Sequence, residues 1–61
     1  MKINVRGLDR FTGKRFDYVK ENVAQVAYLN HHLVVIYKDA TTSIYDSSCT
    51  DDLMVTVLEG E

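Results

Sequence analysis

The residues most able to do chemistry are an adjacent histidine pair, a single cysteine and nearby acids. Neighbouring residues of a strand point to opposite faces, so His31 and His32 would converge on one metal ion only if a turn twisted them together. A third ligand is also needed, and Cys49, Asp51 and Asp52 follow no spacing typical of a metal site. We therefore predict no metal ion or other cofactor, and two solvent-facing turn histidines.

Cys49 is the only cysteine, and it could act as a nucleophile only with a base beside its sulfur and an oxyanion hole. No pattern in the sequence brings these groups together, and a small β domain has little room for a deep pocket. We therefore predict that the protein is not an enzyme. One cysteine also excludes an intrachain disulfide, and without a signal-like apolar N-terminus it favours a cytoplasmic location.

The acidic residues around the Ser/Thr-rich stretch 47–52 lack the central glycine and terminal glutamate of a calcium loop. We interpret the stretch as a solvated loop, with an acidic contact surface for a basic partner as the alternative. Such a surface could also act as a decoy that occupies the nucleic-acid site of another protein. The candidate acidic contacts are Asp46, Asp51, Asp52 and Glu59.

Charge is divided unequally along the chain. The first twenty residues hold six of the seven lysines and arginines against two acids, a net +4, whereas residues 21–61 hold one lysine against seven acids, a net −6. Such asymmetry concerns partners and association rather than fold. Basic groups beside aromatic rings are also the elements of single-strand nucleic-acid binding, which the overall charge of −2 opposes. The candidate nucleic-acid or partner contacts are Arg6, Arg10, Phe11, Lys14 and Arg15.

The length of the chain predicts one small domain spanning residues 1–61. A domain of this size buries only about 60% of the surface that its unfolded chain exposes. Because neither a disulfide nor a metal site supplements this thin core, the sequence favours a homo-oligomer. No apolar run approaches the roughly 20 residues that cross a bilayer, so no membrane association is expected.

Hydrophobic patterning predicts a mainly β chain. Ile3 and Val5 alternate with polar residues, as in a half-buried strand. The β-branched run at 33–37 is typical of a strand that is buried on both faces or central to a sheet. Its second face would need a covering layer from a helix or from another subunit. The expected strands cover residues 2–6, 33–37, 41–45 and 53–58.

Two connections between these strands carry turn signals. Residues 7–13 are expected to link the first strand to the next, with a hairpin tip at 11–13 that uses Gly13 for positive φ. Residues 38–40 are expected to form a turn in which Ala40 stands where a tight hairpin prefers glycine.

Residues 14–29 fit two patterns. A period of two places Phe16 and Tyr18 on one face, which indicates strands, whereas a period of 3.6 forms an apolar stripe that includes Phe16, Val19 and Val23. The first pattern predicts a small antiparallel meander or SH3-like barrel of five to six short strands. The second predicts a β-α-β-β-β arrangement with a helix near residues 16–29. The core expected for the all-β form comprises Ile3, Val5, Phe16, Tyr18, Val26, Leu33, Val35, Ile44, Val55 and Val57.

Together these features predict a non-enzymatic protein-interaction module. It would associate with itself, or dock on a protein partner, through strand edges and complementary charged surfaces. In length, cysteine content and hairpin pattern the chain resembles short all-β accessory proteins of bacteria and phages. No motif carries this resemblance, so it transfers no functional residues.

Overall fold

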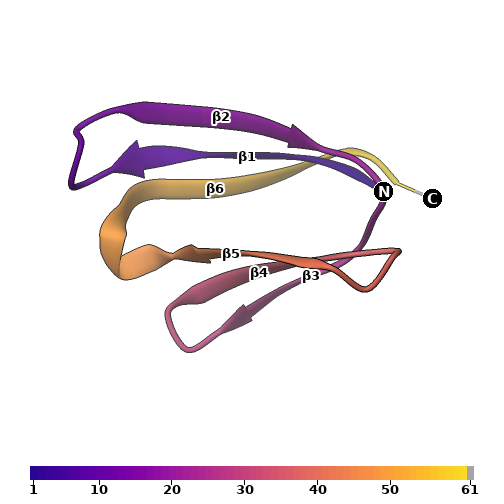
Figure 1. The fold of residues 1–61 in the computed structure, drawn as a ribbon. Coiled ribbons are helices and arrows are strands. Elements are labelled where there is room, and N and C mark those ends of the chain that lie inside the picture. The colour runs from indigo at the N-terminus through magenta and orange to yellow at the C-terminus, as the bar shows by residue number, and fades with distance from the viewer. Residues whose placement is uncertain (61) are drawn as a thin grey trace.

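The computed structural model describes residues 1–60, and it confirms the prediction of a mainly β chain. Two three-stranded antiparallel sheets, β2-β1-β6 and β3-β4-β5, lie one above the other as two layers (Figure 1). The elements are β1 (Lys2–Asp9), β2 (Arg15–Lys20), β3 (Val23–Leu29), β4 (His32–Tyr37), β5 (Thr42–Asp46), the 3₁₀ helix η1 (Ser47–Cys49) and β6 (Thr50–Glu59).

The helix considered near residues 16–29 is wrong, because β2 and β3 occupy that segment. Asn22 lies between them with φ 58°, in the left-handed region that interrupts a right-handed helix and that asparagine tolerates better than most residues. Its carbonyl accepts a hydrogen bond of 2.8 Å from the Lys38 amide. The chain therefore reverses here and passes from the first sheet to the second.

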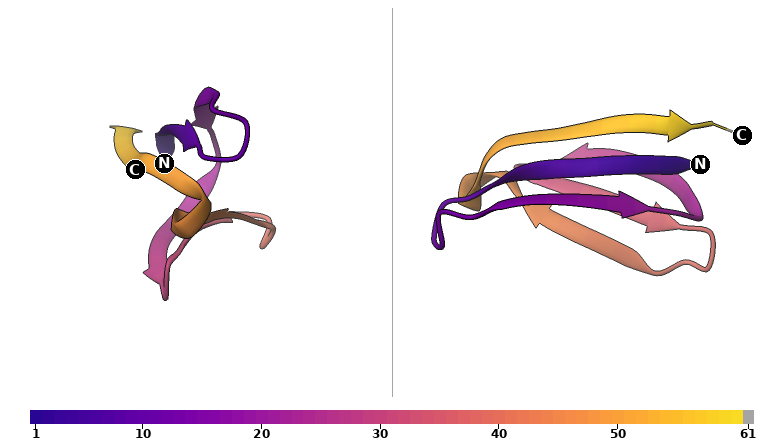
Figure 2. Two further views of the ribbon diagram at one scale, coloured as in Figure 1. Left: turned by 90° about the vertical axis from the view of Figure 1, so that its left-hand side faces the viewer. Right: turned by 90° about the horizontal axis from the view of Figure 1, so that it is seen from above.

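The SH3-like barrel is also wrong, because the two sheets stay open. The layers are joined at one end by Met1 and Val23, whose backbones exchange hydrogen bonds of 2.7 and 3.0 Å. Beyond that end the layers cross at an angle, so that their edges diverge (Figure 2). Closure would require these edge strands to pair with each other, and no strand pairing links the two sheets within residues 1–60.

The core lies between the layers. Its buried side chains come mainly from the two middle strands, which supply Ile3 and Val5 on β1 and Leu33 and Val35 on β4. These four residues were predicted from the sequence, and Val23 on β3 is a fifth buried side chain that was not. Partly buried side chains pack around this centre; they include Phe16, Val26, Tyr45, Leu53 and Val55.

Three residues expected in the core are exposed. Ile44 is 62% exposed because the neighbouring Tyr45 takes the inward position on β5 and stacks on Phe16, with ring centroids 6.0 Å apart. Tyr18 on β2 and Val57 on β6 face the interior, but both belong to edge strands and are 49% and 58% exposed. Side chains are therefore less buried than predicted mainly on the edge strands, at the open sides of the sandwich.

The outer face of β3-β4-β5 has no covering layer within residues 1–60. Val34 and Ile36 on β4 point to this side and are only partly buried by their neighbours in the sheet. β4 is central to its sheet, as one of the two expectations has it, but it is buried on its inner face alone.

The turns combine one predicted glycine with several residues that are not glycine. Gly13 has φ 69°, as expected for the tip of the β1–β2 hairpin. Asn30 and His31 form the two-residue link between β3 and β4, with φ 53° and 21°. Ala40 has φ 70° in the β4–β5 turn, so alanine occupies a conformation that glycine adopts at lower cost.

Candidate interaction surface

Arg10 holds the β1–β2 hairpin against the start of β6. Its Nε donates to Asp51 Oδ1 at 2.7 Å, and its Nη1 donates to the Ser48 carbonyl at 3.0 Å. Its backbone amide donates to the Cys49 carbonyl, also at 3.0 Å. One predicted basic contact therefore pairs with one predicted acidic contact inside the same chain.

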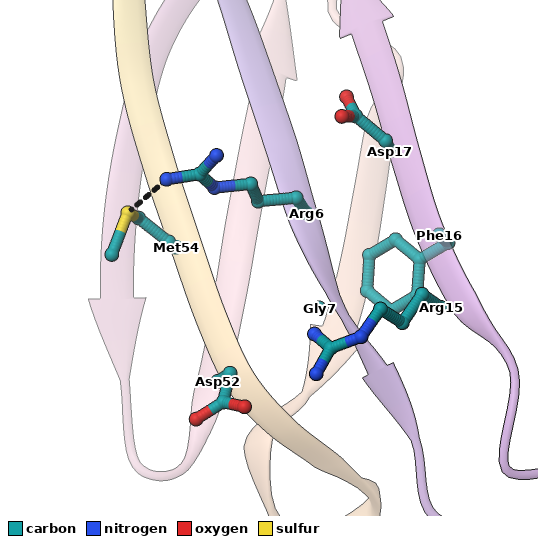
Figure 3. Close-up of a pocket in the computed structure, with 7 residues that line it drawn as sticks. All are labelled: Arg6, Gly7, Arg15, Phe16, Asp17, Asp52 and Met54. Atoms are coloured by element: carbon teal, nitrogen blue, oxygen red, sulfur yellow. Dashed lines mark hydrogen bonds between the residues drawn. The ribbon is translucent and has the colours of Figure 1, made fainter.

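Arg6 and Arg15 line a hollow of about 500 Å³ on the outer face of β2-β1-β6 (Figure 3). Arg6 Nη2 lies 3.1 Å from the Met54 sulfur, which is a weak acceptor. Asp17 and Asp52 also line the hollow, but among residues 1–60 neither guanidinium has a carboxylate within 4.0 Å. The hollow thus holds two cations that could bind an anion and two acids that would oppose it.

Phe11 and Lys14 lie apart from that hollow, at the hairpin tip. Phe11 is 83% exposed, the highest value among the large apolar side chains described. Asp9 organises the tip, because its Oδ1 accepts from the amides of Phe11 at 2.8 Å and Thr12 at 3.3 Å. The five predicted basic contacts are therefore divided among the hollow, the Arg10 tether and this tip.

The predicted acidic contacts are also spread out. Asp46 caps η1, accepting from the Ser48 hydroxyl at 2.6 Å and the Ser48 amide at 2.9 Å. These two hydrogen bonds, the hydroxyl contributing more, lower the pKa of Asp46. Asp52 is on the outer face near Arg15, whereas Glu59 ends the ten-residue β6. The four acids therefore do not form a single face, and the decoy hypothesis stays a prediction.

The histidines and the cysteine do not converge on one point. His31 is an exposed turn residue whose carbonyl accepts from the Ser47 amide and hydroxyl. His32 begins β4, with its Nε2 3.9 Å from Asp46 Oδ2. Cys49 is partly buried, and its sulfur lies 3.8 Å from the Ser48 hydroxyl. Over residues 1–60, no three His, Cys, Asp or Glu side chains are grouped so that they could hold a metal ion.

The edge strand β6 is the most continuous uncharged surface of the first sheet. Its segment Met54–Leu58 carries no charge, and Met54, Val57 and Leu58 are 47–58% exposed. Val57 stands beside Ile3 and so faces the interior, yet it stays accessible because β6 is at the edge of its sheet. An exposed, apolar strand edge is a template for pairing with another chain.

The other edges differ from β6. β2 carries Arg15, Asp17 and Lys20 within six residues, and charged side chains on an edge strand discourage pairing. β5 is only five residues long and ends in Asp46. β3 is also uncharged, but its first residue, Val23, already bonds to Met1. Sequence patterning predicted a strand at residues 53–58 without its place in the sheet, so it gave no sign that β6 would be an edge.

No family model, curated protein or solved structure matches this chain significantly. In the described part of the chain, no helix has the length and apolar character needed to cross a membrane.

Proposed function

We propose that the protein is a non-enzymatic interaction module that associates through the exposed edge of β6, with a second copy of itself as its first partner. This proposal depends mainly on the uncharged, half-exposed segment Met54–Leu58 at the edge of the β2-β1-β6 sheet. A strand added here would form backbone hydrogen bonds and would cover the exposed side of Val57. With an unpaired Cys49, the proposal also places the protein in the reducing cytoplasm.

The thin core supports the same proposal. Five side chains are buried within residues 1–60, and domains of about 60 residues have little stability to spare. Association that buries further apolar area contributes roughly 25 cal/mol for each Å² removed from water. Binding at β6 would therefore stabilise the fold as well as join the chains.

The test is a pair of lysine substitutions at similarly exposed valines on opposite edges of one sheet. Val57 is 58% exposed on β6 and Val19 is 54% exposed on β2. We expect sedimentation equilibrium at micromolar concentration to give a mass above 7.0 kDa for the wild type and for Val19→Lys, and 7.0 kDa for Val57→Lys. Circular dichroism would establish that both variants are folded. A wild type of 7.0 kDa, or a Val57→Lys variant that associates as the wild type does, would contradict the proposal.

A second candidate is binding of single-stranded nucleic acid on the outer face of β2-β1-β6. It is favoured by the two guanidinium groups of Arg6 and Arg15, which line one hollow and lack a carboxylate partner within residues 1–60. Phosphate contacts weaken steeply with salt. Oligonucleotide binding at about 50 mM salt that Arg6→Ala with Arg15→Ala abolishes would support this candidate, and no binding there would exclude it.

A further inference from the structure

We infer that the β6 association is a closed, antiparallel two-fold dimer in which Thr56 of one copy lies opposite Thr56 of the other. This inference rests on the proposed function and adds the geometry of the interface. It joins the two β2-β1-β6 sheets into one six-stranded sheet with β2 at each outer edge.

The sequence of β6 has an approximate mirror symmetry around Thr56. Val55 and Val57 flank it, and Met54 and Leu58 flank those in turn. Antiparallel pairing about Thr56 therefore places each valine opposite a valine and each methionine opposite a leucine. Apolar cross-strand pairs and Thr–Thr pairs are both favourable in sheets. A second copy thus supplies the complement of this edge without any foreign sequence.

The side-chain pairs that it forms distinguish this register from its neighbours. The inward faces of the two copies stay on one side of the joined sheet only if a residue on the two-fold axis lies opposite its own copy. The two neighbouring registers therefore centre on Val55 and on Val57. Centring on Val55 sets Met54 opposite Thr56 of the second copy, an apolar side chain against a hydroxyl. Centring on Val57 brings Glu59 opposite Val55. The Thr56 register alone pairs apolar side chains with apolar ones, and Thr with Thr, over the whole of Met54–Leu58.

The geometry of β6 sets the length of this interface. The pairing of β6 with β1 shifts register between Lys2 and Ile3 and again between Arg6 and Leu8, so the regular part of β6 is Met54–Val57. Bulges increase the local twist and turn an edge away from a neighbour. The contact is therefore short and closes after two copies, since the outer β2 edges carry charges that oppose further addition.

Disulfide trapping tests the register. In a Cys49→Ser background, which removes the chain's only cysteine, Thr56→Cys should form a cross-linked dimer on mild oxidation or with a short bis-maleimide. Residues directly opposite in an antiparallel pair have Cα atoms about 4.5–5.5 Å apart, within the range that a disulfide or this linker can span. Val55→Cys and Val57→Cys should cross-link as a mixture of the two variants, and each poorly alone.

The outcomes separate this inference from the proposed function. If sedimentation shows no association, both fail. If the wild type associates and Val57→Lys does not, but Thr56→Cys stays uncross-linked while Val55→Cys or Val57→Cys links to itself, the interface is right and the Thr56 register is wrong. A mass that rises beyond two copies with concentration would overturn the closed dimer while leaving the β6 contact intact.

Discussion

Gly7 is a single residue whose missing side chain lets two neighbouring side chains approach the backbone of β1. The sequence places it in the connection after the first strand, but β1 continues through Asp9 and Gly7 is buried within it. A Cβ atom at this position would lie 2.7 Å from Thr50 Cγ2 and 2.9 Å from Phe16 Cζ. The absent side chain is what allows Phe16 to lie across β1.

We expect Gly7→Ala to lower the free energy of unfolding by about 1–3 kcal/mol, the usual cost of overpacking a filled site. Urea unfolding followed by circular dichroism would measure the change. Gly60→Ala is the control, because no heavy atom lies within 4 Å of a Cβ built there. Equal stability of Gly7→Ala and the wild type would mean that Phe16 and Thr50 move aside without cost.

At the scale of the elements, the turns carry the conformational strain. Besides Gly13, five of residues 1–60 have positive φ: Asn22, Asn30, His31 and Ala40 between strands, and Asp52 within β6. Asparagine and aspartate tolerate this region because their side chains bond locally, but alanine has no such compensation. Asp39 steadies the β4–β5 turn by accepting from the Thr41 hydroxyl at 2.6 Å and the Thr41 amide at 3.1 Å.

Ala40→Gly should raise the free energy of unfolding by about 0.5–1 kcal/mol. Relief of the left-handed conformation gains about 1–2 kcal/mol, and the greater freedom of glycine in the unfolded chain removes part of that gain. The control, Ala24→Gly in β3, lacks positive φ and should lower the free energy of unfolding instead. Thermal unfolding midpoints of the two variants should therefore move in opposite directions.

Local patterns predicted the elements better than their placement. The alternation around Ile3 and Val5 and the glycine at the hairpin tip are signals within a few residues, and both were confirmed. Ile44 was misplaced because its neighbour Tyr45 is equally suited to the core, and only the ring of Phe16 on another strand decides between them.

The open sandwich and its edge strand depend on contacts that no local pattern encodes. The pairing of β1 with β6 joins residues about fifty positions apart, and nothing near Met54–Leu58 shows that this strand has a neighbour on one side alone. The same holds for the Arg10–Asp51 pair, 41 residues apart. The basic and acidic sets could be picked out by residue type, but their mutual pairing could not.

At the scale of the whole molecule, the charge division along the chain is partly neutralised by folding. Arg10 pairs with Asp51 at 2.7 Å, and Lys2 lies 3.9 Å from Glu21. The β1–β2 hairpin and β6 carry opposite charges as neighbours in one sheet. Because exposed pairs of this kind contribute little to stability, their main effect is on register and on the field that a partner meets.

Stability of the whole fold should fall on the acid side. Hydrogen bonds from Thr41 lower the pKa of Asp39, and those from Ser48 lower the pKa of Asp46. A carboxylate whose pKa is lowered by folding stabilises the protein above its unfolded pKa, and this contribution is lost as pH falls through the folded value. Urea midpoints should therefore decrease as the pH is lowered below about 4.

Asp46→Asn should lower the urea midpoint at neutral pH and reduce the loss between neutral and acid pH, since the titrating group is gone. Asp52→Asn is the matched control, because within residues 1–60 its carboxylate has no hydrogen-bond or ion-pair partner. Parallel pH profiles for the wild type and Asp46→Asn would show that the cap of η1 does not contribute to acid sensitivity.

The order of strands in the two sheets also has a consequence for synthesis. β3, β4 and β5 are consecutive in the chain, so their sheet can assemble from short-range contacts while translation continues. The other sheet joins β1 and β2 to β6, which follows β5 in the chain and leaves the ribosome after it. Long-range pairing of this kind is slow, so β1 must wait with one edge unpaired and Ile3 and Val5 incompletely covered until β6 emerges. During that interval the nascent chain is open to the same strand addition that β6 offers after folding.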